Sequence, residues 1–206
     1  MPSVPAQRGK AIRLLKRRGI MRLSELQAEG VHPPTLSRLR DEGVVVRPGR
    51  GLYELADAEL GLHHGLAEIA KRIPKGVICL ISALQFHEIT LQNAPVIWVA
   101  IGEKDRKPKI GHPPIRTVRY GEKALLLGVQ TRRIDRVPVK IFDPAKTVVD
   151  CFRYRRAVGL DVAMEALRLA LQSKKATPAA IAAFARELRI WTVIRPYLES
   201  AAAHEA

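Results

Sequence analysis

The chain has 206 residues, 47% of them hydrophobic and 27% charged, which is typical of a folded globular protein and unlike a disordered one. Its 35 lysines and arginines exceed its 20 aspartates and glutamates, and the resulting net charge of +15 favours a polyanionic partner such as nucleic acid. The sequence has no membrane-length apolar run, no signal-peptide core and only two widely separated cysteines, so we expect a cytoplasmic protein that contacts no membrane and binds no metal.

The first thirty residues predict two helices. Apolar residues at helical spacing indicate an amphipathic helix over residues 6–18, which Gly19 ends. Ser24 and Gln27 then match a capping box, in which the Ser24 hydroxyl accepts a free N–H and Gln27 reaches back. The pattern therefore predicts a second, short helix that stops at Gly30.

A third helix and a hairpin follow directly. Pro33 and Pro34 suit the first turn of a helix, where a missing N–H costs nothing, and this helix runs to residue 41 or 42. Two β-type runs within residues 44–55 flank the turn at Pro48-Gly49 and predict a β-hairpin. Three helices and a hairpin in this order indicate a winged helix-turn-helix, a fold that binds double-stranded DNA.

The third helix has the two faces that a recognition helix needs. Leu36 and Leu39 are expected to face a small core, whereas Thr35 and Arg38, with Ser37 alongside, are expected to point outward to base edges in the major groove. Arginines at the hairpin tip are expected to meet phosphates or the minor groove. The predicted DNA-binding residues are Ser24, His32, Thr35, Ser37, Arg38, Arg40, Arg47 and Arg50.

The rest of the chain predicts a second domain. We expect a winged helix at residues 1–58, a linking helix within 59–75 whose helical pattern covers 59–72, and a C-terminal domain at 76–206 with a mixed sheet and packed helices, an α+β protein overall. Within this domain we predict strands at 77–81, 96–101, 115–120, 124–131 and 137–142, a polar loop at 104–114, a short helix capped at Ser82, and helices from Asp143 and at 161–172, 178–188 and 190–200. Asp161 and Thr177 are the expected caps of two of these helices.

Two carboxylates and a lysine in the C-terminal half could suggest a metal-dependent nuclease. A structural interpretation is better supported: Asp143 precedes Pro144 as a helix N-cap does. Lys146 and Asp150 are then four residues apart on that helix, where they form a solvated ion pair. We therefore predict no catalytic residue here.

Other reactive side chains also have structural explanations. Ser82 and His87 lack a third orienting residue and are expected to be a helix cap and a half-buried histidine. His63 and His64 lack a third metal ligand nearby, and Cys79 is expected in the core. The sequence contains no glycine-rich phosphate loop, so we predict no enzyme activity, no metal and no cofactor.

The ordered set of motifs resembles the AbiEi family of antitoxins, from bacterial type IV toxin–antitoxin and phage-defence operons. The matching residues are Thr35–Gly43 with Gly49–Tyr53, then Ser82-Ala83-Leu84 with His87, the strand at 96–101, and Asp143–Asp150. The resemblance implies that the winged helix represses its own promoter at inverted repeats. It also implies that the C-terminal domain counters a partner toxin with a nucleotidyltransferase fold, with or without a stable complex.

Two other functions are compatible with the same sequence. One is an operon regulator whose C-terminal domain senses a ligand, and the other is a nuclease with a DNA-targeting domain. Residues 61–140 hold 14 basic and 6 acidic side chains and are the most basic part of the chain. This excess leaves room for contacts of the second domain with DNA phosphates or with an RNA.

Overall fold

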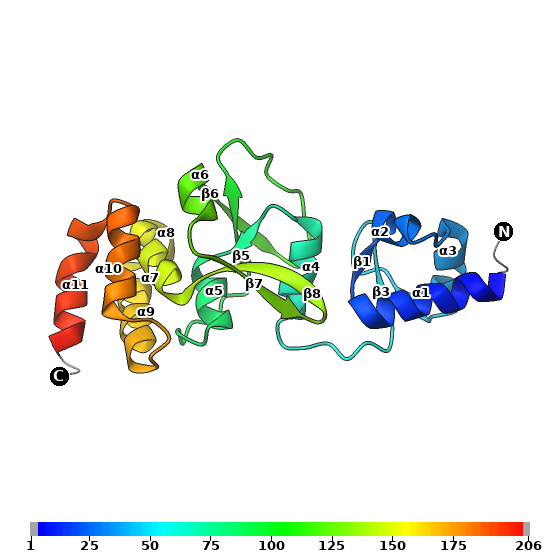
Figure 1. Ribbon diagram of the computed structural model, residues 1–206, viewed down its shortest axis with the longest axis horizontal. Coiled ribbons are helices and arrows are strands. Elements are labelled where there is room, and N and C mark those ends of the chain that lie inside the picture. Colours follow the sequence, from blue (N-terminus) through cyan, green and yellow to red (C-terminus); the bar gives the residue numbers. More distant parts are fainter. Residues whose placement is uncertain (1–3, 204–206) are drawn as a thin grey trace. The chain divides into compact units, whose positions relative to one another are not determined.

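The computed structural model describes residues 4–203 and contains two compact units (Figure 1). The first unit comprises residues 1–74 and 132–139, and the second comprises residues 75–131 and 140–206. The elements form a winged helix followed by a mixed sheet with helices, which confirms the predicted α+β class. The division at residues 58, 75 and 76 and the linking role of the helix there stay predictions.

The first unit is built on a helix-turn-helix and a small antiparallel sheet. Its helices are α1 (Val4–Arg18), α2 (Leu23–Ala28), α3 (Pro33–Asp41) and α4 (His64–Arg72). Its strands are β1 (Met21–Arg22), β2 (Val45–Val46) and β3 (Leu52–Leu55), in the order β1-β3-β2. Met21 pairs with Tyr53 and Val45 pairs with Leu55, so β3 joins the hairpin to the start of α2.

One apolar core holds this unit together. Leu14 of α1, Leu26 of α2, and Leu36 and Leu39 of α3 are buried in it, together with Val45 of β2. Removal of a leucine side chain from water contributes roughly 1.5–3 kcal/mol, so these contacts stabilise the packing of three short helices. The predicted inward face of the third helix, with Leu36 and Leu39, is confirmed.

The start of α2 differs from the prediction. Its N-cap is Arg22, whose backbone N–H donates to Glu25 Oε2 at 2.6 Å, and Ser24 lies exposed in the first turn. The predicted cap by Ser24 with Gln27 is therefore wrong. Because the chain leaves the β1–β3 pairing at Arg22, the helix begins before the serine is reached.

The helix that was predicted to start at residue 59 starts at His64 instead. Leu62 lies in the preceding turn with 95% of its surface exposed, so the apolar spacing there does not reflect a buried helix face. The Gly61 N–H donates to the Asp135 carboxylate at 3.2 Å, which holds this segment in a non-helical conformation.

The second unit is organised around a five-stranded mixed sheet. Its strands are β4 (Val77–Ile78), β5 (Ile97–Gly102), β6 (Ile115–Tyr120), β7 (Val129–Ile134) and β8 (Val137–Phe142), in the order β6-β5-β4-β8-β7. β4 is antiparallel to β5 and parallel to β8, while β5 and β6 are parallel. The residues between Arg132 and Val139, at the turn of the β7–β8 hairpin, belong to the first unit.

Seven helices of the described chain complete the second unit: α5 (Leu80–Phe86), α6 (Glu122–Leu126), α7 (Pro144–Arg153), α8 (Arg155–Val158), α9 (Leu160–Gln172), α10 (Pro178–Glu187) and α11 (Trp191–Ala203). The most deeply buried of them is α7, which packs against α5, α9 and α10. Its buried residues run without a break from Ala145 to Phe152. A helix that is buried all round occupies the centre of a core.

Two predicted strands of this unit are partly helical. β4 ends at Ile78 and α5 begins at Leu80 with Cys79 as its N-cap, so the predicted strand at 77–81 is confirmed only for Val77 and Ile78, and the predicted cap at Ser82 is wrong. Residues 124–131 form the end of α6 and the start of β7. Gly128, with φ +67°, separates these two elements, and the leucine-rich run before it suits a helix as well as a strand.

The predicted helix caps have mixed outcomes. The Thr177 hydroxyl accepts the Ala180 N–H at 3.2 Å and caps α10 as predicted. Asp161 is not a cap, because α9 begins at Leu160 with Gly159 at the N-cap position. Between residues 4 and 203 no helix is long and apolar enough to cross a lipid bilayer.

Candidate nucleic-acid interface

Helix α3 presents a polar, cationic face. Ser37, Arg38 and Arg40 are exposed, and His32 is exposed at the N-cap position. The Arg38 guanidinium makes no hydrogen bond or ion pair within the described residues, which leaves its N–H donors free for a ligand. A free arginine on the outer face of the second helix of a helix-turn-helix is the group that reads guanine in such folds.

Arg40 is less available than Arg38. Its guanidinium bonds Asp41 Oδ1, at 2.8 Å from Nη2 and 3.2 Å from Nε, and this contact raises the pKa of Arg40. Both side chains are exposed, so the ion pair contributes little to stability. A phosphate can replace Asp41 as the partner of Arg40.

Thr35 does not belong to this face. Its exposure is only 9%, so the prediction that it points outward is wrong. Successive residues of a helix are about 100° apart, which puts Thr35 only about 40° from Leu39 on the inner face. A role of Thr35 in DNA binding stays a prediction, but the exposed position on which that prediction rested is not found.

The turn of the β2–β3 hairpin carries the two wing arginines. Arg47 and Arg50 are exposed, and Gly51, with φ +71°, lets the chain re-enter β3. A side chain at Gly49 would collide with the Arg72 guanidinium, which would lie 2.5 Å from its Cβ. The α4 arginine therefore packs directly beneath the wing turn.

A buried amide fixes the turn between α2 and α3. Gln7 of α1 is 5% exposed, its Nε2 donates to the Gly30 carbonyl at 2.9 Å, and its Oε1 accepts the His32 N–H at 3.2 Å. The amide thus holds both sides of the turn that aims α3. Sequence reasoning missed this residue, because a glutamine within an amphipathic helix gives no signal of a distant partner.

Helix α4 is attached to the helix-turn-helix through α2. Lys71 Nζ donates to both carboxylate oxygens of Glu25, at 2.8 and 2.9 Å, and the Arg22 guanidinium donates to the Lys71 carbonyl. Partial burial of Glu25 favours its neutral form. The bonds from the Arg22 backbone and Lys71 outweigh this effect and lower the pKa of the Glu25 carboxyl. This contact also had no signal in the sequence.

The suspected nuclease residues have structural roles. Asp143 is the N-cap of α7, as predicted, and its Oδ1 accepts the N–H groups of Ala145 and Lys146 at 2.8 and 3.3 Å. Lys146 and Asp150 do pair, at 2.5 Å, but both side chains have no exposed surface. The predicted pairing is therefore correct, but the prediction that the pair is solvated is wrong, because α7 lies at the centre of the core. Burial raises the pKa of Asp150 and lowers that of Lys146.

Ser82 and His87 also serve the fold. The Ser82 hydroxyl lies within α5, accepts the Trp98 N–H at 2.9 Å and thereby ties α5 to β5. His87 is buried rather than half-buried, and its Nε2 lies 2.7 Å from the Phe142 carbonyl oxygen. Cys79 is buried as predicted, and no group of three potential metal ligands occurs among the described residues.

A second group of basic side chains follows β5. Lys104, Arg106, Lys107 and Lys109 are exposed on the irregular segment that leads to β6. Asp105, beside them, is directed into the chain and accepts the Gly102 N–H at 2.9 Å. The segment therefore has a cationic outer surface on the second unit.

Comparison with known proteins identifies the segment that carries α3 and the wing. Residues 10–56 match a family described as a transcriptional regulator, the AbiEi antitoxin. No curated protein matches the chain. The chain is similar to the crystal structure of the RV2827C protein from Mycobacterium tuberculosis, with 15% identity and a TM-score of 0.58 over 98% of this chain and 79% of that chain, a likeness of fold. Over residues 10–56 the chain therefore matches the AbiEi antitoxin family of transcriptional regulators, and the resemblance predicted from its sequence is confirmed for this segment.

Proposed function

We propose that this protein is the antitoxin of a type IV toxin–antitoxin operon and that it acts in the cytoplasm. The winged helix represses the operon promoter by binding inverted repeats. The second unit counters a nucleotidyltransferase-like toxin encoded beside it, and the proposal assigns no catalytic step to this chain.

The observation that carries this proposal is the unpaired Arg38 on the outer face of α3, within the segment that matches the family. The recognition face of α3 also carries Ser37 and Arg40, and Arg47 and Arg50 extend from the hairpin. A helix supplies contacts to base edges, and a cationic hairpin supplies contacts to phosphates.

Operator binding is tested with the full chain and its own promoter DNA in an anisotropy titration. A bidentate contact of arginine with guanine is worth roughly 1–3 kcal/mol, so Arg38→Ala should weaken operator binding about tenfold or more. Arg168→Ala, an exposed arginine of α9, is the matched control and should bind as the wild type does. Equal affinity of the two variants would refute the assignment of Arg38.

The antitoxin role is tested separately from repression. The neighbouring toxin gene is induced from a promoter that lacks the operator, and the protein is supplied in trans. The Arg38→Ala variant should rescue growth as well as the wild type, because neutralisation is assigned to the second unit. Failure of the wild type to rescue growth would refute the antitoxin role without affecting the DNA-binding assignment.

The cationic segment at residues 104–109 supports a nucleic-acid contact of the second unit. Its exposed lysines and arginine lie outside the winged helix, and neutralised phosphates release counterions wherever they are contacted. We assign this segment to sequence-independent contacts, with promoter phosphates or with the RNA on which the toxin acts.

A further inference from the structure

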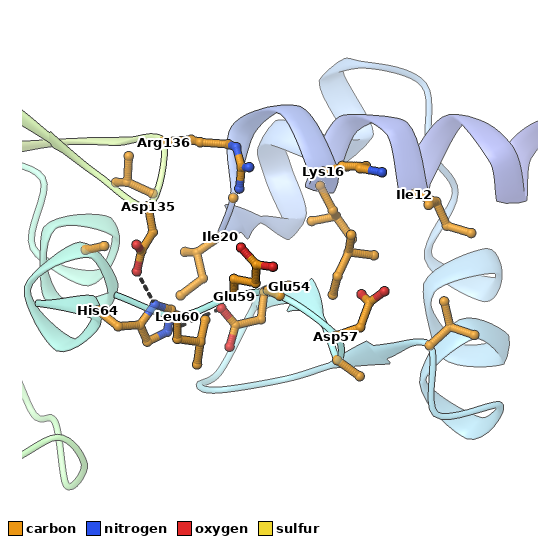
Figure 2. Close-up of a pocket in the computed structure, with 18 of the residues that line it drawn as sticks. Ile12, Lys16, Ile20, Glu54, Asp57, Glu59, Leu60, His64, Asp135 and Arg136 are labelled. Carbon is orange, nitrogen blue, oxygen red and sulfur yellow. Dashed lines mark hydrogen bonds and ion pairs between the residues drawn. The ribbon is translucent and has the colours of Figure 1, made fainter. Parts of the chain in front are cut away.

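The first unit contains a half-open cavity of about 610 Å³ (Figure 2). Its wall is formed by α1, by the end of β3 with the segment that follows it, by the start of α4 and by the β7–β8 turn. Apolar side chains line much of it, among them Ile12, Leu15, Ile20 and Leu60. Its volume and apolar lining are typical of a pocket for a small organic molecule.

The charged groups of the cavity are mostly acidic. Four carboxylates line it, those of Glu54, Asp57, Glu59 and Asp135, against the cationic side chains of Lys16 and Arg136. This balance is opposite to that of the whole chain, whose net charge is +15. The cavity is therefore a local site of negative charge on a positive protein.

Two of these carboxylates are left without partners. Asp57 and Glu59 are exposed in the segment after β3 and form no hydrogen bond or ion pair within the described residues. Within residues 4–203, neither the Lys16 ammonium nor the Arg136 guanidinium lies within ion-pair distance of a carboxylate. The cavity thus keeps its opposite charges apart instead of pairing them.

Glu54 is the most enclosed of the carboxylates, with 7% of its surface exposed. Its Oε2 lies 3.3 Å from His64 Nε2, and His64 Nδ1 lies 2.8 Å from Asp135 Oδ2 (Figure 2). Burial raises the pKa of Glu54, whereas His64 opposes the shift and Glu68 and Asp135 add to it. A bound cation would stabilise the ionised Glu54 that burial disfavours.

We infer that this cavity binds a small organic cation, an amine, amidine or guanidine attached to an apolar body. The cationic group lies among Glu54, Asp57 and Glu59, where it donates hydrogen bonds to carboxylate oxygens. The apolar body packs on Ile12, Leu15 and Ile20. The described residues offer no metal-ligand set here, which leaves an organic cation as the occupant that fits both the acidic and the apolar wall.

The cavity is coupled to the winged helix by shared elements. β3 supplies Glu54 and is also the second strand of the hairpin, and α1 supplies Ile12 and also carries Gln7, which holds the α2–α3 turn. A ligand that packs on both elements favours one of their arrangements. Occupancy of the cavity by the cation is therefore expected to change the affinity of the protein for its operator. This effect rests on the proposed function, whereas binding of the cation to the cavity does not.

The binding test uses three small probes of nearly equal shape. Benzamidine is cationic, benzamide is neutral and benzoate is anionic, and each is titrated into the full chain by calorimetry without DNA. Benzamidine should bind saturably and at least about tenfold more tightly than the other two, because it alone of the three carries a positive charge. Non-specific attraction to a chain of net charge +15 would favour benzoate instead.

Variants locate the probe within the cavity. The double variant Asp57→Asn/Glu59→Gln changes only exposed side chains, so it should fold normally and lose benzamidine affinity by about tenfold or more. Glu54→Gln should give a similar loss, and Glu122→Gln, an exposed acid of α6, should bind as the wild type does. Equal binding of benzamidine and benzamide, or wild-type affinity in the double variant, would overturn the inference. A promoter titration with and without benzamidine then measures the coupling by itself.

Discussion

The Gln7 side chain donates to the main chain on one side of the α2–α3 turn and accepts from the other side. Gln7→Glu keeps the size and the acceptor but removes the donor to Gly30. A buried acceptor left without its donor costs about 1–3 kcal/mol, and a charged carboxylate beside it adds to the cost. We expect a lower free energy of unfolding and weaker operator binding, measured by urea denaturation and by anisotropy.

Gln92→Glu is the control for this substitution, because Gln92 is exposed in a loop and the change in net charge is the same. The two variants should differ in unfolding free energy. If Gln7→Glu is as stable as Gln92→Glu and binds DNA equally well, Gln7 does not hold the recognition helix.

The Lys146–Asp150 pair allows a second prediction, since both side chains are fully buried. Lys146→Met leaves Asp150 buried without its cation, which should cost about 3–5 kcal/mol. The double variant Lys146→Met/Asp150→Leu should lose much less than the sum of the two single variants. The exposed Arg195–Glu199 pair has the same four-residue spacing, and Arg195→Met should cost less than about 1 kcal/mol. Thermal unfolding of these variants is the measurement. Similar costs at Lys146 and Arg195 would show that burial does not set the value of the pair.

At the scale of elements, the hairpin is expected to contact phosphates more than bases. Removal of Arg47 and Arg50 together should flatten the dependence of log affinity on log salt concentration by up to about two phosphate contacts. Discrimination between the operator and a scrambled sequence should change little. The pair Arg168→Ala/Lys174→Ala removes equal charge from the second unit and should leave the slope unaltered. A wild-type slope in the wing variant would exclude contact between the hairpin and DNA.

Helices whose N-cap stands directly before a proline were predictable from the sequence, as were the strands at 115–120 and 137–142, whereas the caps expected at Ser24 and Asp161 were not found. Asp143 and Thr177 each stand before a proline and cap the helices expected of them. The predicted strand at 124–131 is correct only from Val129, because the run of leucines before Gly128 has no period that distinguishes a helix from a strand. Thr35 was misplaced because the inner face of α3 is wider than the spacing of its two leucines indicated.

For the molecule as a whole, alkaline pH should lower the stability of the second unit, because its buried thiols and phenols ionise there. Burial raises the pKa values of Cys79, Cys151 and Tyr120, and raises that of Tyr154 to about 12. Groups with a raised pKa in the folded state contribute stability at pH values below their ordinary pKa, near 9 for a thiol and 10 for a phenol. This contribution is lost as the pH rises through their folded-state values. Lys146, whose pKa is lowered, acts in the opposite sense, but it is one group against four.

We therefore expect the melting temperature to fall steadily between pH 9 and 12. Circular dichroism follows unfolding, and absorbance near 295 nm follows ionisation of the phenols. The difference between wild type and Tyr120→Phe isolates Tyr120, whose ionisation should accompany the loss of helical signal. A constant melting temperature across this range, or ionisation of Tyr120 in the folded protein, would contradict the prediction.

Long-range contacts limited what the sequence could reveal about the candidate interface. The exposed Arg38, Arg47 and Arg50 followed from local motif order. Gln7, which lies 23 residues from Gly30, and Lys71, which lies 46 residues from Glu25, act through partners that only the folded chain brings together. The residues that hold α3 in place were therefore hidden in the sequence, whereas the exposed arginines proposed to contact DNA were visible in it.

The discontinuity of the first unit has a consequence for how the chain can be divided. Residues 132–139 belong to that unit although they are far along the sequence. A cut after Pro74 therefore leaves one piece of the first unit on the larger fragment. Fragments 1–74 and 75–206, produced separately, should recognise each other and reassociate, as the halves of a split reporter protein do. The junction at Pro74 is thus a natural place to build a two-part sensor from this chain.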